Sequence, residues 1–176
     1  MKVNKKKGDL LSWGDFTFKR SNSKGLNSRK LNNYIGVGYC LTRDLNINDT
    51  ISDFDLKKAT TATIVAARLK SSRLKRKALL KIGNLSSIEY CLKNALKFND
   101  INHTILATSN LSSDDELKHQ TLNSQVIFHQ GDPDDVVRRY LEIIDELKLD
   151  IVVRVTGDMP FISNDILQIL LKSHYK

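Results

Sequence analysis

Apolar runs and polar segments alternate along residues 63–175, whereas residues 1–58 show no long helical periodicity. Runs rich in β-branched residues predict buried strands, and apolar residues spaced three and four positions apart predict helices. The predicted strands are 64–67, 103–108, 126–129 and 151–156, and the predicted helices are 85–98, 112–121, 133–148 and 163–175. Strands that alternate with helices of this length are typical of an α/β fold with a mostly parallel sheet and right-handed crossovers.

Residues 1–58 predict a small, mainly β unit of short strands and turns that contains an internal repeat. Residues 8–16 (GDLLSWGDF) and 48–56 (NDTISDFDL) align without gaps at an offset of 40. Each copy places a turn before an apolar pair and a second acidic turn before an apolar residue. The repeat favours a pseudo-symmetric module in which each half buries the apolar face of the other. The alternative is chance similarity between two turn-rich segments.

A short polar stretch, KKATTAT, separates this unit from the alternating region. We place the domain boundary there, which predicts domains over residues 1–58 and 62–176. In the second domain a polar cluster follows each predicted strand, over residues 68–77, 108–113, 130–135 and 156–158. The carboxyl ends of parallel strands lie at one edge of a sheet, where open α/β sheets bind their ligands.

The first of these polar clusters is strongly basic. Residues 59–81 carry seven Lys or Arg and no Asp or Glu, within a chain whose net charge is +8. Arginine binds phosphate oxygens in a bidentate manner and lysine supplies a point charge, so this loop favours a compact polyanion such as a nucleoside triphosphate. The alternative is a basic face that is merely solvated. The sequence has no GxxxxGK[ST] loop, which disfavours a Walker-type NTPase or a dinucleotide site.

Further features bear on location and on metal binding. No apolar run approaches the roughly 20 residues that span a bilayer, and the basic start MKVNKKKGD has no apolar stretch behind it. Cys40 and Cys91 show no metal-ligand spacing, so we expect reduced thiols in a cytoplasmic protein with no membrane partner.

Asp158, after the last predicted strand, is placed to hold magnesium on a triphosphate, and the alternative is a turn-forming role. Arg138 and Arg139 are expected at the surface of their helix, and the alternative is that either of them faces the site.

Three blocks of this region resemble the cytidylyltransferase family, which includes acylneuraminate, 3-deoxy-manno-octulosonate and spore-coat polysaccharide cytidylyltransferases. They are IVAARLKSSRLKRKALLKIGNLSSIEYCL, GDPDDVVRRYLEII and VVRVTGDMPFIS, in the family's order. The resemblance implies a Rossmann-like sheet of the glycosyltransferase-A type. It also implies an enzyme that transfers CMP from CTP to a sugar acid, of the sialic-acid type or related, in surface polysaccharide biosynthesis. Pyrophosphate would be released, with magnesium as the cofactor.

By position, the resemblance also assigns roles to single residues. It assigns triphosphate binding to Arg68, Ser71, Arg73 and Lys77, and catalysis to Arg73 and Lys77. It assigns the metal-binding acid to Asp158 and a further nucleotide-binding position to Arg139.

The chain departs from the family at three positions of the basic loop. Lys70 stands where the family has glycine, and Lys75 and Arg76 stand where it has Pro-Gly. Glycine permits close backbone approach to phosphate or a positive φ, so long cations at these positions are expected to stiffen the loop or block that approach. The chain also ends before the family's usual end. We therefore expect a fragment that lacks sugar contacts, a second metal carboxylate and much of the interface of a homodimer.

The first unit resembles the SAF, or antifreeze-like, domain of sialic acid synthases, a β-clip module. The blocks that carry this resemblance are KKKGDLLSWGDFTFKR and YIGVGYCLTRDLNINDTISDFDLKK. A Lys-Arg-Pro-Gly-type stretch of that family is reduced here to Lys19-Arg20, and the usual first strand would lie upstream of Met1. We therefore expect a partial domain in which Arg20 is a surface residue rather than a sugar contact.

Two functions from different classes are consistent with these features. The first is a nucleotidyltransferase whose partners are CTP and a sugar acid, with impaired activity as a fragment. The second is a non-catalytic module whose basic loop binds nucleic acid or acidic polysaccharide. Nucleic acid is the less expected partner, because the positive charge is concentrated in one short loop. A third outcome is a fragment that does not fold alone because its strand edges are unpaired.

Overall fold

The structure is a computed structural model that describes residues 1–20, 25–70 and 74–175. Its internal contacts divide the chain into two units, one of Met1–Ala59 with Gln168–Lys176 and one of Thr60–Leu167. The division falls within the polar stretch that separates the two regions of the sequence. The carboxy-terminal residues, which the sequence analysis assigned to the second domain, group with the first unit. Within the described ranges, no helix is both long and apolar enough to cross a membrane.

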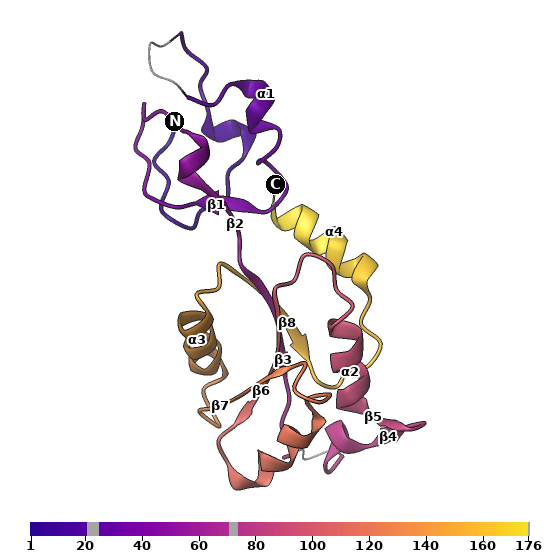
Figure 1. Ribbon diagram of the computed structural model, residues 1–176. Helices are drawn as coiled ribbons and strands as arrows, with labels where there is room; N and C mark the ends of the chain where they lie inside the picture. Colours follow the sequence, from indigo (N-terminus) through magenta and orange to yellow (C-terminus); the bar gives the residue numbers. More distant parts are fainter. Residues whose placement is uncertain (21–24, 71–73, 176) are drawn as a thin grey trace. The chain divides into compact units, whose positions relative to one another are not determined.

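The larger unit is built on a sheet of four parallel strands. In order across the sheet these are β7 (Ile127–Gly131), β6 (His103–Ser109), β3 (Thr61–Ala66) and β8 (Ile151–Thr156). Helix α3 (Val136–Leu147) covers one face of the sheet and helix α2 (Ser87–Ala95) covers the other, as Figure 1 shows. The predicted α/β fold with a parallel sheet is therefore confirmed.

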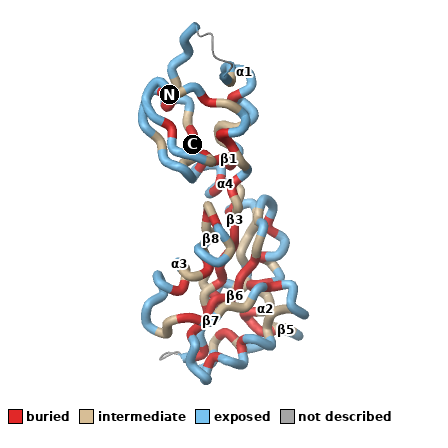
Figure 2. The backbone as a smooth tube through the Cα atoms, turned by 60° about the vertical axis from the view of Figure 1, so that its left-hand side comes forward, coloured by how far each residue is buried: buried red, intermediate tan, exposed pale blue. Residues whose placement is uncertain are grey.

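Alternation along the strands fills a core on each face of this sheet. Ile64 of β3 and Ile105 of β6 are register partners, are fully buried, and pack in one cluster with Ile143 of α3. The next residues along both strands, Val65 and Leu106, point to the opposite face because side chains alternate along a strand. Figure 2 shows the central strands β3 and β6 largely buried and the outer loops exposed. Burial on both faces explains why these strands are apolar runs in the sequence.

Helix α2 begins later than the sequence pattern predicts. Strands β4 (Lys81–Ile82) and β5 (Leu85–Ser86) pair as a hairpin around Gly83, whose φ is +63°. Ser86 then caps the helix, because its hydroxyl accepts a hydrogen bond from the amide of Glu89 at 3.2 Å. Leu85 is apolar, as expected at the start of a helix. Leu85 and Ser86, the first two residues of the predicted helix 85–98, instead form the second strand of the hairpin.

Two other predicted helices differ in their start or type. Helix α3 begins at Val136 because Asp135 is its N-cap, so Pro133 lies before the cap rather than in the first turn. The predicted helix at 112–121 forms as a 3-10 helix, η4 (Ser112–Gln120), whose N-cap makes no side-chain hydrogen bond and two of whose acidic side chains bond to other segments. Helix α4 (Asn164–His174) lies close to its predicted position.

The smaller unit consists of short elements around its own apolar cluster. Its elements are the 3-10 turns η1 (Trp13–Asp15) and η2 (Asp53–Asp55), helix α1 (Ser28–Leu31), and the antiparallel strands β1 (Tyr39–Leu41) and β2 (Leu56–Lys58). The buried side chains of the cluster are Met1, Leu11, Leu31, Leu41, Leu45, Ile51 and Leu56. Leu11 and Ile51 occupy equivalent positions of the sequence repeat, so both copies contribute to one core.

Hydrogen bonds confirm the repeat, because they recur when each partner is exchanged for its equivalent in the other copy. The amide of Gly8 donates to the carbonyl of Leu41 at 2.9 Å, and the amide of Asn48 donates to the carbonyl of Met1 at 2.9 Å. Gly8 and Asn48 also share a positive φ, of 90° and 70°. The two copies therefore make the same contacts to each other, as expected for a pseudo-two-fold module.

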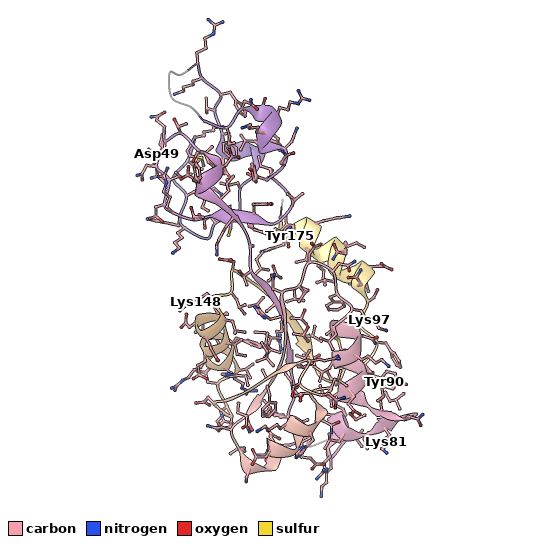
Figure 3. The ribbon with its side chains drawn as sticks, viewed as in Figure 1. Asp49, Lys81, Tyr90, Lys97, Lys148 and Tyr175 are labelled. Atoms are coloured by element: carbon pink, nitrogen blue, oxygen red, sulfur yellow. The ribbon has the colours of Figure 1, made fainter. Side chains whose placement is uncertain are left out.

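The end of the described chain packs on this smaller unit. Gly38 has a φ of +76°, and a Cβ at that position would lie 2.9 Å from the ring of Tyr175. Tyr175 follows the end of α4 and is buried (Figure 3). Close packing of an aromatic ring on a glycine accounts for the grouping of the last residues with the first unit.

Candidate functional site

The strand order marks one position at the edge of the sheet. Strands β3, β6 and β7 follow one another in one direction across the sheet, whereas β8 returns to the other side of β3. In open α/β sheets, ligands bind outside the carboxyl ends of the strands at the point where the order reverses. Here that point lies between β3 and β8, at the loops that begin with Ala67 and Gly157.

Gly157 allows these two loops to approach each other closely. Its amide donates to the carbonyl of Ala66 at 2.8 Å, which extends the contact between the strands beyond the end of β8. A Cβ on Gly157 would lie 2.7 Å from the Cβ of Ala67 and 2.8 Å from Cδ1 of Ile88. Packing between the strand ends therefore requires a glycine at this position.

Lys77 and Asp158 meet at this edge although they lie 81 positions apart in the sequence. Lys77 begins the short 3-10 turn η3 (Lys77–Leu79), and its ammonium donates to Oδ2 of Asp158 at 2.7 Å. Their side chains remain 43% and 44% exposed. The hydrogen bond from Lys77 lowers the pKa of the Asp158 carboxyl, and one from the Thr156 hydroxyl adds to this effect. Asp158 is therefore ionised at neutral pH and faces solvent.

The segment that follows Asp158 is held on α2. The side-chain amide of Asn94 donates to the carbonyl of Pro160 at 2.8 Å, and the ring centroids of Tyr90 and Phe161 lie 6.3 Å apart. Tyr90 projects from α2 (Figure 3). Burial of Cys91 on the same helix raises the pKa of its thiol to about 12, and the charge of Asp158 adds to the shift. The thiol is therefore neutral, so Cys91 packs beside the site rather than acting as a nucleophile.

The other predicted phosphate-binding residues belong to the loop after β3. Its described cations before η3 are all exposed, and they are Arg68, Lys70, Lys75 and Arg76. Ser71 and Arg73 lie outside the described residues. The loop is closed at its base, because the amide of Arg76 donates to the carbonyl of Leu69 at 3.3 Å. We call Leu69 and Arg76 the loop neck.

Two carboxylates of η4 hold the loop neck, a role that the sequence analysis missed. Oδ1 of Asp114 accepts from the amide of Leu69 at 2.7 Å, and its Oδ2 accepts from the hydroxyl of Ser109 at the end of β6. Glu116 forms an ion pair with the guanidinium of Arg76. Their place directly after the polar cluster 108–113, which follows the second predicted strand and lies at the same sheet edge as the basic loop, is the signal that could have indicated this role.

Arg76 adopts the left-handed conformation, with a φ of +53°. This is a position where the resembled family has Pro-Gly, and the conformation costs a non-glycine residue about 1–2 kcal/mol. Lys70, where the family has glycine, does not have a positive φ. The backbone conformation therefore explains why the resembled family has glycine at the position of Arg76. It does not explain the family's glycine at the position of Lys70.

Arg139 was expected at the surface of its helix, and this expectation is wrong. The residue is 3% exposed, and its Nε and Nη2 donate to the carbonyl of Asp132 at 3.2 and 2.9 Å. A Cβ on Gly131 would lie 2.7 Å from Cγ of Arg139, so the chain leaving β7 packs directly on this side chain. The burial is tolerated because the guanidinium bonds a backbone carbonyl. Arg139 belongs to the β7 end of the sheet, with β6 between β7 and β3.

The donor set of the site bears on metal binding. In the part of the chain that the structure describes, no group of three or more His, Cys, Asp or Glu side chains is arranged to hold a metal ion. Asp158 offers one ionised and accessible carboxylate. Magnesium is usually held by one or two carboxylates together with the phosphates of a substrate. These residues therefore fit a magnesium ion that arrives with a triphosphate.

Comparison with known proteins covers the larger unit and the end of the chain. A family model described as cytidylyltransferase matches residues 62–176. The spore coat polysaccharide biosynthesis protein SpsF of Bacillus subtilis is 26% identical over 116 residues, which are 64% of this chain and 48% of that protein. A 3-deoxy-manno-octulosonate cytidylyltransferase of Rickettsia canadensis is 31% identical over 120 residues, 65% of this chain and 48% of that protein. The chain thus spans about half the length of the curated relatives it matches.

Solved structures show the same fold. A cytidylyltransferase from Leptospira borgpetersenii is 25% identical with a TM-score of 0.62, over 65% of this chain and 48% of that one. A CMP:2-keto-3-deoxy-manno-octonic acid synthetase solved with CTP is 24% identical with a TM-score of 0.57, over 65% of this chain and 47% of that one. At this identity the second likeness concerns the fold alone.

Proposed function

The chain belongs to the cytidylyltransferase family, and from this premise we propose that it binds CTP and transfers CMP to a sugar acid in polysaccharide or glycan synthesis. The names of two relatives support the acceptor class and the pathway class, because one is a 3-deoxy-manno-octulosonate cytidylyltransferase and the other a spore coat polysaccharide biosynthesis protein. Because the chain spans about half the length of these relatives, CTP binding and CMP transfer are separate predictions for it.

The observation that carries the proposal is the exposed Lys77–Asp158 pair at the reversal of strand order. An exposed ion pair adds little to stability, yet this one keeps a cation and a carboxylate side by side where a ligand would bind. A triphosphate can replace Asp158 as the partner of Lys77, and a cation carried by the triphosphate can replace Lys77 as the partner of Asp158. The exchange leaves no charge unpaired, which favours a nucleotide–magnesium complex over either component alone.

The proposed transfer is a phosphoryl substitution. A hydroxyl oxygen of the sugar acid loses its proton to solvent and forms a bond to the α-phosphorus of CTP, and the bond between that phosphorus and the oxygen bridging to the β-phosphate breaks. Pyrophosphate leaves with the electron pair of that bond. Lys77 and Arg68 are the described cations that we assign to the oxygens on which negative charge develops. When bound, magnesium would supply further neutralisation of phosphate charge.

Calorimetric titration of the chain with CTP, in the presence and absence of magnesium, tests the proposal. We expect saturable binding that requires magnesium. We expect Lys77→Ala and Asp158→Ala each to weaken it by about tenfold or more, because each removes a charge-assisted contact. Lys97→Ala is the matched control, because it also removes a lysine charge but at a different place. Lys97 follows the carboxy-terminal end of α2, whereas Lys81 lies near the amino-terminal end of that helix (Figure 3).

Two results would count against this function. Unchanged affinity in both site variants would show that the site is assigned wrongly. Binding that is indifferent to the identity of the nucleotide and to magnesium, and that falls steeply with salt, would favour a module that binds nucleic acid or acidic polysaccharide. A gel-shift titration against salt, with CTP as the competitor, distinguishes these cases.

For the smaller unit we propose an SAF-like module. Its support is the pseudo-two-fold repeat, in which equivalent residues such as Leu11 and Ile51 fill one core. Arg20 is exposed, in keeping with the surface role expected from the sequence. Reading the coding sequence next to this one, and determining the structure of the unit together with any residues encoded there, would test whether a further strand completes it.

A further inference from the structure

We propose that Asp114 and Glu116 of η4 are positioning residues for the nucleotide site, because together they hold the loop neck. The neck, Leu69 and Arg76, is closed by a backbone hydrogen bond, and it is flanked directly in the sequence by Arg68 and Lys77, two of the predicted phosphate-binding cations. Lys77 follows the neck directly and reaches Asp158. The ligand in this inference rests on the proposed function, whereas the geometry does not.

Asp114 fixes one side of the neck. It is a carboxylate with 1% exposure, and burial of such a group is costly unless its oxygens are hydrogen-bonded. Both oxygens are used, one by the amide of Leu69 and the other by the hydroxyl of Ser109. Ser109 ends β6, and Leu69 lies just beyond β3. Asp114 thus ties the first loop residues to the carboxyl end of the neighbouring strand.

Glu116 fixes the other side of the neck. Its carboxylate pairs with the guanidinium of Arg76, and both side chains are about half exposed. Arg76 has the unfavourable left-handed conformation, so its position depends on contacts that compensate for that cost. Both neck residues are therefore held by η4, through two carboxylates that lie two positions apart in its sequence.

The consequence for the site is geometric. A fixed neck presents its sequence neighbours Arg68 and Lys77 from a defined base, and less ordering is needed when a ligand binds. Lys77 is joined to the neck by one peptide bond, so a displaced neck displaces the ammonium that faces Asp158. Since small displacements of binding groups can cost up to about a hundredfold in rate, loosening the neck should weaken the site without removing any group that contacts the ligand.

Hydrogen exchange at the amides of Leu69 and Arg76, measured without ligand, tests the geometry. We expect Asp114→Ala to speed exchange at Leu69 by about tenfold or more, because that amide loses its acceptor. Asp114→Asn keeps an acceptor oxygen and should restore most of the protection. Glu116→Gln should speed exchange at Arg76. Asp115→Asn is the matched control, since the carboxylate of Asp115 accepts from the side chain of Gln130 instead.

Calorimetry with CTP and magnesium on the same variants tests the link to function. We expect about tenfold weaker affinity for Asp114→Ala, partial rescue by Asp114→Asn, a smaller loss for Glu116→Gln, and wild-type affinity for the control. A role confined to stability would lower the melting temperature but leave the affinity of the folded protein unchanged. If Asp114→Ala does not fold, Glu116→Gln provides the test, because its side chain is exposed.

Unchanged exchange at both neck amides in Asp114→Ala and Glu116→Gln would overturn the inference. So would faster exchange that leaves CTP affinity unaltered. If the wild-type chain does not bind CTP, the proposed function fails, and the exchange measurement then decides by itself whether η4 holds the neck.

Discussion

In the smaller unit, the carboxylate of Asp55 accepts hydrogen bonds from the guanidinium of Arg43 at 2.5 Å and from the amide of Ser52 at 2.8 Å. In the larger unit, the carboxylate of Asp158 accepts from the ammonium of Lys77 at 2.7 Å. The side chain of Asp55 is 9% exposed, whereas that of Asp158 is 44% exposed. Both are aspartates paired with a partly exposed cation, so the exposure of the carboxylate distinguishes the two pairs. We call Arg43–Asp55, with its buried carboxylate, a closed pair and Lys77–Asp158, with its exposed carboxylate, an open pair.

The closed arrangement occurs twice in the smaller unit. Asp15, the equivalent of Asp55 in the repeat, accepts from the amide of Ser12 at 2.8 Å and pairs with Lys5 at 3.0 Å. Because a buried aspartate that binds a serine amide recurs at equivalent positions of the repeat, we infer that it stabilises the fold of each copy. The Lys77–Asp158 pair instead joins η3 to the segment after β8, at the sheet edge where we propose that the nucleotide binds. The comparison therefore favours a role in stability for the first kind of pair, and it agrees with the proposed ligand-binding role of the second.

The largest expected effect comes from removing the closed carboxylate. Asp55→Ala leaves the amide and hydroxyl of Ser52 without their acceptor, so we expect the free energy of unfolding to fall by about 3 kcal/mol. Urea unfolding followed by the fluorescence of Trp13 measures it, because this single tryptophan lies in the smaller unit. Lys6→Ala, which removes an exposed pair with Asp44, is the control with a small effect. A loss below that of the control would contradict the closed assignment.

The same difference in stability should depend on pH. Burial acts to raise the pKa of the Asp55 carboxyl, but hydrogen bonds from Arg43 and Ser52 outweigh it and lower the pKa below 3.8. Since the folded pKa is the lower one, the contribution is complete above the unfolded value, near 3.9, and is lost as the pH falls through the folded value. The difference between wild type and Asp55→Ala should therefore be constant from pH 7 to about pH 5 and shrink below about pH 4. A difference that grows in acid would refute this sign.

The open pair depends on the close approach of two strand ends, and Gly157→Ala should disrupt it. The added methyl group would meet Ala67 and Ile88 at distances that force the chain to move. We expect the larger unit to lose about 2 kcal/mol, as in other overpacked cores. Amide exchange along β3 measures the stability, and CTP affinity reports whether Lys77 and Asp158 still converge. Wild-type exchange in this variant would mean that the strand ends are not tightly packed.

The sequence was sufficient for features that arise from local pattern. The parallel strands follow from apolar runs, and the repeat follows from matching turns. The convergence of Lys77 and Asp158 follows from the rule that parallel strands end at one edge. The hairpin before α2 was missed because Leu85, the apolar residue at the predicted helix start, satisfies both strand and helix patterns.

Other features depend on contacts between distant segments, which no local pattern encodes. Arg139 has the spacing of a residue beside an apolar helix stripe, yet it is buried because the carbonyl of Asp132 turns toward it. Asp114 and Glu116 have the sequence of a helix start, yet they bond to a loop more than 35 residues earlier. When a charged side chain fits either a surface role or a role in a distant contact, its role can be assigned only once its partner is known.

The smallest expected change in stability tests the open pair directly. Asp158→Asn removes the charge but keeps the shape, and because the pair is solvated we expect the stability of the larger unit to change by less than about 0.5 kcal/mol. Amide exchange along β3 measures this change, with Lys97→Ala as the reference for a neutralised surface charge. CTP–magnesium affinity should fall in the same variant, because the amide is a weaker ligand for a hard cation than the carboxylate. A loss as large as that of Asp55→Ala, with unaltered affinity, would make Lys77–Asp158 a second structural pair and leave the sheet edge without its ligand-binding carboxylate.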